Sequence, residues 1–325
     1  MGADLTAARG AGSAALASAP TLEALYPLLA ARSIGAGWNK PEPAMWPAPR
    51  MNFVPFHWRY ADAQAAFEAA GRLISTEQAE RRNLILHNPI PGNTYATLRT
   101  LVVAYQAILP GETARSHRHT PNALRLVLDD GGGAYTTVEG VKLPMADGDV
   151  LLTPNWRWHG HGHDGDRPSV WIDYLDVPLV QLLEPIFFES HPERMETPSS
   201  TGRDSPFVFA WKETERRLSS APQTAHFGHS VELGNPAMST TGLHMMRLPL
   251  GARTEPLRST ANNIYTALHG EGRTTIDGQT FEWRRGDVLA APAGRPHHHE
   301  AGSDAVLFRV TDEPVMRVLG LLRQY

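Results

Sequence analysis

Short hydrophobic runs and turn residues alternate along most of the chain from residue 98 onward. Runs such as Leu98–Ile108 and Leu124–Leu128 are separated by turn sequences such as Pro110-Gly111, and such runs recur about every eight to twelve residues. This spacing is typical of a small antiparallel sandwich or barrel. We therefore expect one β barrel over residues 98–190.

A second strand-rich block repeats landmarks of the first. The Gly-Asp-Val-Leu sequence of residues 148–151 returns at residues 286–289. Self-similarity of this kind indicates the duplication of one structural unit. The sequence therefore predicts a second barrel with a C-terminal helix over residues 230–325, joined to the first barrel by a connector over residues 191–229.

The residues before the first barrel have a different pattern. Residues 1–20 are rich in Ala, Gly and Ser and lack the apolar core of a signal peptide, which predicts a disordered tail. Apolar residues at helical spacing predict helices over Leu22–Ala31 and Ala61–Leu73, and Ser75–Gln78 has the sequence of a capping box that would begin a third helix. Residues 21–97 are therefore expected to form an N-terminal helical arm.

Composition narrows the classes of function. The chain has 325 residues, 42% hydrophobic and 20% charged, and a formal net charge of -4 without any run of Lys or Arg. Nucleic acid is therefore not an expected partner. A membrane is not expected either, because no stretch approaches ~18 apolar residues. The absence of cysteine excludes disulfides and thiolate ligands and fits a cytoplasmic location, so any metal site must use His, Asp or Glu.

Histidines cluster at three places in the chain. Alternate residues of a strand share a face, so the side chains of His117 and His119 point the same way and can chelate one metal ion together. Eight of the fifteen histidines lie in the groups His117/His119, His159/His161/His163 and His297/His298/His299. Because single scattered histidines are mostly surface or core residues, the clustering is what favours a metal site.

The first two clusters stand in a pattern that resembles the paired motifs of the cupin family. Gly111 lies six residues before His117, and Gly148 lies eleven residues before His159. The resemblance implies an all-β bicupin, with two double-stranded β-helix (jelly-roll) barrels and the N-terminal helical arm. It also implies that His117, His119 and His159 are the metal ligands.

The sequence departs from the cupin pattern at the usual fourth ligand. A glutamate often follows the H-x-H motif, but Thr120–Arg125 contains no carboxylate. Three neutral imidazoles leave a divalent metal its full charge and open coordination positions. An aromatic acid that offers a carboxylate and a neighbouring phenolate would neutralise that charge on binding.

Several further segments resemble the gentisate 1,2-dioxygenase group, which includes salicylate and 1-hydroxy-2-naphthoate ring-cleaving relatives. The segments that carry the resemblance are Ala79–Arg82, Gln106–Glu112, His117–Arg125, Gly133–Thr136, Thr153–His159, Trp171–Pro178 and Ala305–Phe308. The resemblance implies an Fe(II)-dependent enzyme that uses O2 to cleave the ring of a salicylate-type aromatic acid. Cleavage would fall between the ring carbons that bear the carboxyl and hydroxyl groups.

Residues outside the metal triad are also expected to take part in the chemistry. Arg81 and Arg125 match the substrate-binding arginines of the group, and a guanidinium suits a carboxylate because it donates two parallel hydrogen bonds. Gln106 could orient substrate or oxygen, or pair with the backbone. His161 is the candidate for proton transfer, since imidazole titrates near neutral pH. Asp173 is expected to orient one of the histidine rings.

Three positions look unlike those of the group. Val102 stands where relatives carry a bulky aromatic residue, Ala104 on the same strand face is also small, and Asn83 differs too. We expect these residues to shape the pocket around the ring substituent, although ordinary core packing explains Val102 and Ala104 about as well. The departures favour a differently substituted salicylate, such as 5-nitrosalicylate, over gentisate.

The second block carries only half of the cupin pattern. Gly286–His297 matches the second motif, whereas Pro256–Thr260 stands where the H-x-H motif would be. A single histidine does not hold a catalytic metal, so His297–His299 are expected to be structural or weakly metal-binding. The second barrel is then a degenerate scaffold. His163, where cupins often have asparagine, is also expected to be structural.

Two other functions stay open at this point. Three histidines also suit zinc, which would favour a hydrolase or isomerase. A non-catalytic ligand-binding bicupin is the third reading, although its histidines should then be incomplete in both halves. In either case duplicated cupins often associate through their sheets, so a homo-oligomer is expected.

Overall fold

The computed structural model describes residues 13–47, 49–75, 82–234 and 238–325. The chain divides into two compact units, Met1–Arg50 and Met51–Tyr325. In the first unit, α2 (Leu22–Ala30) is the helix expected from the apolar spacing, and none of its residues is buried. Thr21 caps this helix by accepting a hydrogen bond from the N–H of Ala24 at 3.2 Å. No helix of the described residues is long and apolar enough to cross a membrane.

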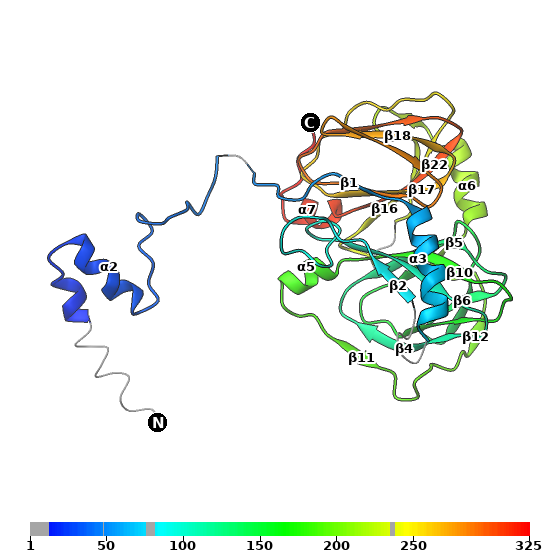
Figure 1. Ribbon diagram of the computed structural model, residues 1–325, viewed down its shortest axis with the longest axis horizontal. Helices are drawn as coiled ribbons and strands as arrows, with labels where there is room; N and C mark the ends of the chain where they lie inside the picture. The colour runs from blue at the N-terminus through cyan, green and yellow to red at the C-terminus, as the bar shows by residue number, and fades with distance from the viewer. Residues whose placement is uncertain (1–12, 48, 76–81, 235–237) are drawn as a thin grey trace. The chain divides into compact units, whose positions relative to one another are not determined.

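The second unit holds two β barrels; Figure 1 colours the first from cyan to green and the second from yellow to red, with its first strand in blue. In the described residues the first barrel has two six-stranded sheets, with strand orders β13-β8-β5-β10-β3-β2 and β11-β4-β9-β6-β7-β12. Its strands are β2 (Arg82–Ile85), β3 (Val102–Ile108), β4 (Thr113–His119), β5 (Ala123–Asp129), β6 (Ala134–Val138), β7 (Val141–Pro144), β8 (Val150–Thr153), β9 (His159–His163), β10 (Ser169–Leu175), β11 (Phe188–Ser190), β12 (Ser200–Thr201) and β13 (Val208–Phe209).

The second barrel has the same plan with fewer strands. Its described strands form a seven-stranded sheet, β1-β20-β17-β22-β16-β15-β14, and a three-stranded sheet, β19-β18-β21. They are β1 (Phe56–Trp58), β14 (Gln223–Thr224), β15 (Gly228–Glu232), β16 (Gly242–Leu248), β17 (Asn263–His269), β18 (Glu271–Ile276), β19 (Gln279–Arg284), β20 (Val288–Ala291), β21 (His297–Ala301) and β22 (Ala305–Thr311). The helices of this unit are α3 (Tyr60–Leu73), α5 (Val177–Leu182), α6 (Trp211–Ser220) and α7 (Glu313–Val318). The expected all-β pair of barrels is confirmed.

The segments before and between the barrels contribute strands that the sequence did not predict. The expected helical arm contains α3, but it also contains β1, which pairs with β20, and β2, which pairs with β3. The expected connector contains β12 and β13, which pair with β7 and β8 of the first barrel. These strands are too short to show an alternating pattern, and the third helix expected from Ser75–Gln78 falls outside the described residues.

The repeated Gly-Asp sequence fastens a helix to each barrel. Asp287 accepts a hydrogen bond at 2.7 Å from the N–H of Tyr60, the first residue of α3, and Asp149 accepts one at 2.9 Å from the N–H of Trp211, the first residue of α6. A helix N-terminus favours a negative charge because its first N–H groups lack intrahelical partners. Each barrel thus accepts a hydrogen bond from the first residue of a helix that does not belong to its own run of strands. The shared role of this Asp explains why the Gly-Asp sequence appears twice.

Strand alternation separates the core between the barrels from the interior of the first barrel. Val103, Tyr105 and Ala107 belong to one hydrophobic cluster that also holds residues of the second barrel, such as Ile264 and Phe308. Alternate residues of a strand point to opposite faces. The even-numbered residues of β3, from 102 to 108, therefore face the interior of the first barrel.

Candidate metal centre and active site

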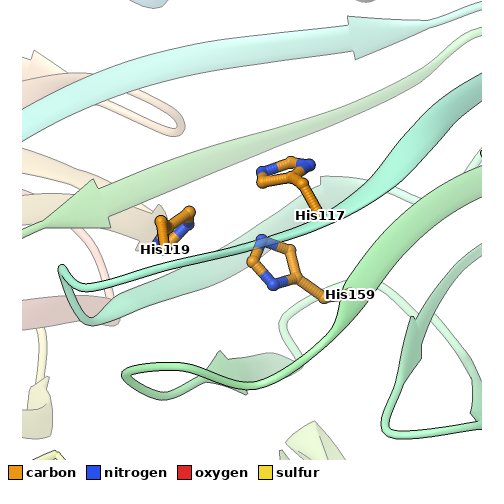
Figure 2. Close-up of side chains that lie close together, drawn as sticks. All are labelled: His117, His119 and His159. Atoms are coloured by element: carbon orange, nitrogen blue, oxygen red, sulfur yellow. The ribbon is translucent and has the colours of Figure 1, made fainter. Parts of the chain in front are cut away.

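Two strands of one sheet bring three histidines together. His117 and His119 lie on β4, and His159 begins the neighbouring strand β9, directly opposite His117. Figure 2 shows the three rings turned toward a common centre, and each offers a ligand atom within 4.8 Å of the others. His159 is buried, whereas His117 and His119 are partly exposed. His159 is therefore the innermost of the three rings.

The hydrogen bonds of the three rings prepare them to bind a metal. The Nδ1 atoms of His117, His119 and His159 lie 3.0, 2.8 and 2.9 Å from the backbone oxygens of residues 115, 121 and 157. A carbonyl only accepts, so each Nδ1 carries the proton and each Nε2 keeps its lone pair for a metal. Burial lowers the pKa of His159 well below its ordinary value of 6.5, and the nearby imidazoles lower it further. This donor set fits a divalent transition metal.

A buried arginine lies beside the triad. Arg125 on β5 is only 1% exposed. Its Nη1 donates to Oγ1 of Thr136 at 2.7 Å and lies 2.6 Å from Nδ1 of His161 and 3.1 Å from its Nε2. Because a guanidinium only donates, the nearer nitrogen, Nδ1 of His161, accepts, and the ring carries its proton on Nε2. The His161 ring centroid is 6.1 Å from that of His159.

Asp173 lies beside Arg125. Its Oδ1 is 3.6 Å from Nε of Arg125, which stands directly across from it in the sheet. Both side chains are buried. The guanidinium thus lies between Asp173 and His161, and the expectation that Asp173 orients a histidine ring stays a prediction.

The other expected pocket residues occupy the same inner face. Gln106 on β3 is buried and stands between Trp171 on β10 and Asn83 on β2. Val102 and Ala104 are also buried on this face, and Ala104 lies beside Asp173. Asn83, on the edge strand, is exposed.

Arg81 and Arg82 stand in the chain at the start of β2. Arg81 lies outside the described residues. Arg82 is buried and forms an ion pair with Glu112 at 2.8 Å. Arg82 also donates to the backbone oxygen of Ile74 at 2.9 Å, which identifies it as a structural residue.

One residue of the site was missed from the sequence. Oγ1 of Thr136 contacts both Arg125 and Nδ1 of His161, at 2.7 and 3.1 Å. Thr136 lies directly opposite His161 in the pairing of β6 and β9. A threonine on a strand is too common to attract notice, and only the register between the two strands reveals its role.

The second barrel repeats this arrangement without the metal triad. Leu257 lies opposite His297, as His117 lies opposite His159 in the first barrel. The hydroxyl of Tyr265 lies 2.7 Å from Nε2 of His297, the nitrogen that would otherwise face a metal. Nδ1 of His299 lies 2.8 Å from Oγ1 of Thr274. These contacts favour a structural role for the histidines of this barrel.

The buried His297 makes a specific contribution to the pH dependence of stability. Burial lowers the pKa of His297 to about 4 from an ordinary value of 6.5, so the unfolded chain binds a proton between these pH values and the folded chain does not. The free energy of unfolding therefore falls as pH falls through this range, by roughly 3 kcal/mol for this group. His297→Gln should lose correspondingly less stability between pH 7 and pH 4.5 in urea unfolding. An unchanged loss would contradict this account.

Comparison with known proteins agrees with the geometry. The cupin domain family matches residues 104–177 and 244–311, one segment in each barrel. Gentisate 1,2 dioxygenase 1 from Aquipseudomonas alcaligenes is 33% identical over 329 residues, which cover 92% of this chain and 94% of that protein. The chain belongs to the gentisate and salicylate 1,2-dioxygenase family.

Other members of this family support the assignment. A 5-aminosalicylate 1,2-dioxygenase from Comamonas sp is 33% identical, with 93% of this chain and 90% of that protein covered. The crystal structure of a salicylate 1,2-dioxygenase from Pseudaminobacter salicylatoxidans superposes with a TM-score of 0.84 at 29% identity, covering 94% of this chain and 97% of that one. The resemblance found in the sequence is confirmed, and this member of the family is a ring-cleaving dioxygenase with two cupin barrels.

Proposed function

We propose that this dioxygenase uses Fe(II) and O2 to cleave a salicylate-type aromatic acid between the carbons that bear its carboxyl and hydroxyl groups. The substrate class is a substituted salicylate, such as 5-nitrosalicylate, or gentisate. The observation that supports this most strongly is the convergence of three imidazole nitrogens within 4.8 Å of one another, beside a buried arginine. Because the chain belongs to the dioxygenase family, the two alternatives left open by the sequence, a zinc hydrolase or isomerase and a non-catalytic binding protein, are not retained.

We assign the iron ligands to His117, His119 and His159. Each ring offers one nitrogen within 4.8 Å of the others, and none brings a negative charge. When bound there, Fe(II) would supply a Lewis acid with open coordination positions for the aromatic acid and O2. The protein fixes the three rings through their Nδ1 hydrogen bonds.

We assign substrate binding to Arg125 together with Arg81. The guanidinium of Arg125 is buried, and Asp173 and Thr136 fix its orientation. A fixed, desolvated guanidinium recognises a carboxylate by charge-assisted hydrogen bonds. Gln106, uncharged and on the same inner face, is placed to orient the ring or oxygen. We assign Val102 and Ala104, which are small and lie on this face, to the surroundings of the ring substituent.

We assign proton transfer to Nε2 of His161. The ring accepts at Nδ1 from Arg125, so its proton sits on the other nitrogen. Arg125 thus links the substrate carboxylate to the ring that moves the proton. Asp173 is a positioning residue, because it acts through the guanidinium.

The test of this function is an oxygen-electrode screen after anaerobic loading with Fe(II). Gentisate, salicylate, 5-nitrosalicylate and 1-hydroxy-2-naphthoate would be supplied in turn, with Zn(II)-loaded enzyme as the control. We expect oxygen uptake matched one-to-one by loss of at least one acid with Fe(II), and none with Zn(II). Equal activity with zinc, or no uptake with any of the acids, would overturn the proposal.

Arg125→Ala should raise KM strongly and leave the iron content unchanged. The variant removes a charge-assisted interaction worth roughly 1.5–3 kcal/mol, about 10- to 150-fold in KM. Steady-state oxygen uptake measures the effect. Arg216→Ala is the matched control, since Arg216 is an exposed arginine on α6 whose ion pair with Glu213 lies on the surface. Wild-type kinetics in Arg125→Ala would remove Arg125 from the site.

A further inference from the structure

The topology of the first barrel brings two edge strands to one side of it. β3 and β4 are consecutive and are joined by a tight turn, in which the N–H of Glu112 donates to the oxygen of Leu109 at 3.1 Å. β3 belongs to one sheet and β4 to the other, so these two strands lie at the same side of the barrel. Their outer neighbours, β2 and β11, are the last strands of the two sheets. The edges formed by β2 and β11 therefore lie on the same side of the barrel, and β11 pairs with the strand that carries His117 and His119.

On the β2 edge, the residue that faces the site is Ile85. Ile85 lies directly opposite Ala104 of β3. Ala104 in turn lies opposite Asp173 of β10, and Asp173 lies opposite Arg125 of β5. Residues directly opposite one another in a sheet share a face. The neighbouring Leu84 packs instead into the core between the barrels. Ile85 thus stands at the outer end of the row of side chains that leads to Arg125, and 44% of it is exposed.

On the β11 edge, the corresponding residue is Phe188. It lies directly opposite His119, and Ser190 lies opposite His117. Phe188 is therefore on the same side of its sheet as two of the three proposed ligands. It is 68% exposed. Ile85 and Phe188 are thus exposed apolar side chains on edge strands, one from each sheet.

The exposed positions of Ile85 and Phe188 are related to the site. Single exposed apolar residues are common on protein surfaces and by themselves mean little. Here both belong to edge strands, both lie on the site-facing side of their sheets, and the two edges lie on the same side of the barrel. Apolar walls with a few placed polar groups are typical of pockets for small organic ligands.

We propose that Ile85 and Phe188 form the apolar entrance to the metal centre, and that Ile85 limits the size of the ring substituent that the enzyme accepts. The proposal rests on the proposed function, because it takes the ligand to be an aromatic acid held by Arg125. Ala104, between Ile85 and Asp173 in this row, contributes only a methyl group. A ring substituent directed away from Arg125 would lie along Ala104 and end against Ile85.

The test compares a small and a large aromatic acid on variants of Ile85. For Ile85→Ala, kcat/KM for 1-hydroxy-2-naphthoate relative to salicylate should rise by roughly tenfold, and for Ile85→Trp it should fall by a similar factor. The change should lie in KM rather than in kcat, since Ile85 stands at the entrance. Leu250→Ala is the control, because Leu250 is 72% exposed but lies in the second barrel and should leave the ratio unchanged.

Anaerobic binding of the same two acids to the Fe(II)-loaded variants gives a second readout. The ratio of their dissociation constants should shift in the same directions, even for an acid that is bound but not cleaved. Ratios within about twofold of wild type in both Ile85 variants would overturn the role of Ile85. If turnover stays at the wild-type level and the ratios of dissociation constants do not change, the role of Ile85 is wrong but the proposed function stands. If the acids bind and the ratios shift but no turnover occurs, the proposed function is wrong and the role of Ile85 in binding stands.

Discussion

An iron-free and inactive protein is the expected result of replacing His119 by alanine. Removal leaves two neutral imidazoles and no carboxylate within the ligand group, and the hydrogen bond from Nδ1 to the oxygen of Pro121 disappears with the ring. Loss of an outer partner of a ligand alone weakens metal binding by about 10- to 100-fold, so loss of the ligand itself should exceed this range. Iron content after gel filtration and oxygen uptake are the two measurements.

Two other histidines provide the controls for this experiment. His226→Ala removes a partly exposed ring next to the second barrel, whose Nδ1 lies 3.2 Å from the backbone oxygen of Glu255, and should leave iron content and activity at wild-type values. His297→Gln alters the second barrel and should leave one iron per chain. Unchanged iron content in His119→Ala would show that His119 is not a ligand. Loss of iron in His297→Gln would place metal in the second barrel instead.

Local sequence patterns were sufficient to predict the two barrels and the members of the histidine cluster. Turn spacing gave the strands, and alternation placed the side chains of His117 and His119 on one face. His159 could be added because the cupin motif fixes its separation from a glycine turn. Each of these inferences depends on residues close together in the chain.

What the sequence did not reveal depends on register between distant strands. Asp173 meets Arg125 because β10 and β5 pair in one particular register, and no local pattern specifies it. The strands β1 and β2 were missed because they are short and pair with partners far away in the chain. The roles given to Gln106 and Asn83, the domain limits, the homo-oligomer and the cytoplasmic location stay predictions.

The repeated Gly-Asp turn offers the second large effect, on stability. Gly286 has a φ of +88°, and a Cβ built on it would lie 2.4 Å from Cδ1 of Tyr60. Tyr60 cannot easily retreat, because its N–H is bonded to Asp287 and its ring is packed 5.4 Å from that of Tyr105. Any movement of Tyr60 that relieves the overlap with the added Cβ therefore loosens the start of α3 and weakens its hydrogen bond to Asp287 of the second barrel.

Gly286→Ala is expected to lower the free energy of unfolding by roughly 4 kcal/mol or more, the range in which overpacking and backbone strain act together. Gly278→Ala is the matched control, since Gly278 has a φ of +81° but nothing within 4 Å of an added Cβ. The control incurs only the left-handed backbone cost of about 1–2 kcal/mol. Urea unfolding followed by tryptophan fluorescence gives both values, and the difference between them isolates the overlap with Tyr60. Equal losses of unfolding free energy in the two variants would mean that the ring of Tyr60 moves aside freely. The hydrogen bond between Tyr60 and Asp287 would then contribute little to holding α3 on the second barrel.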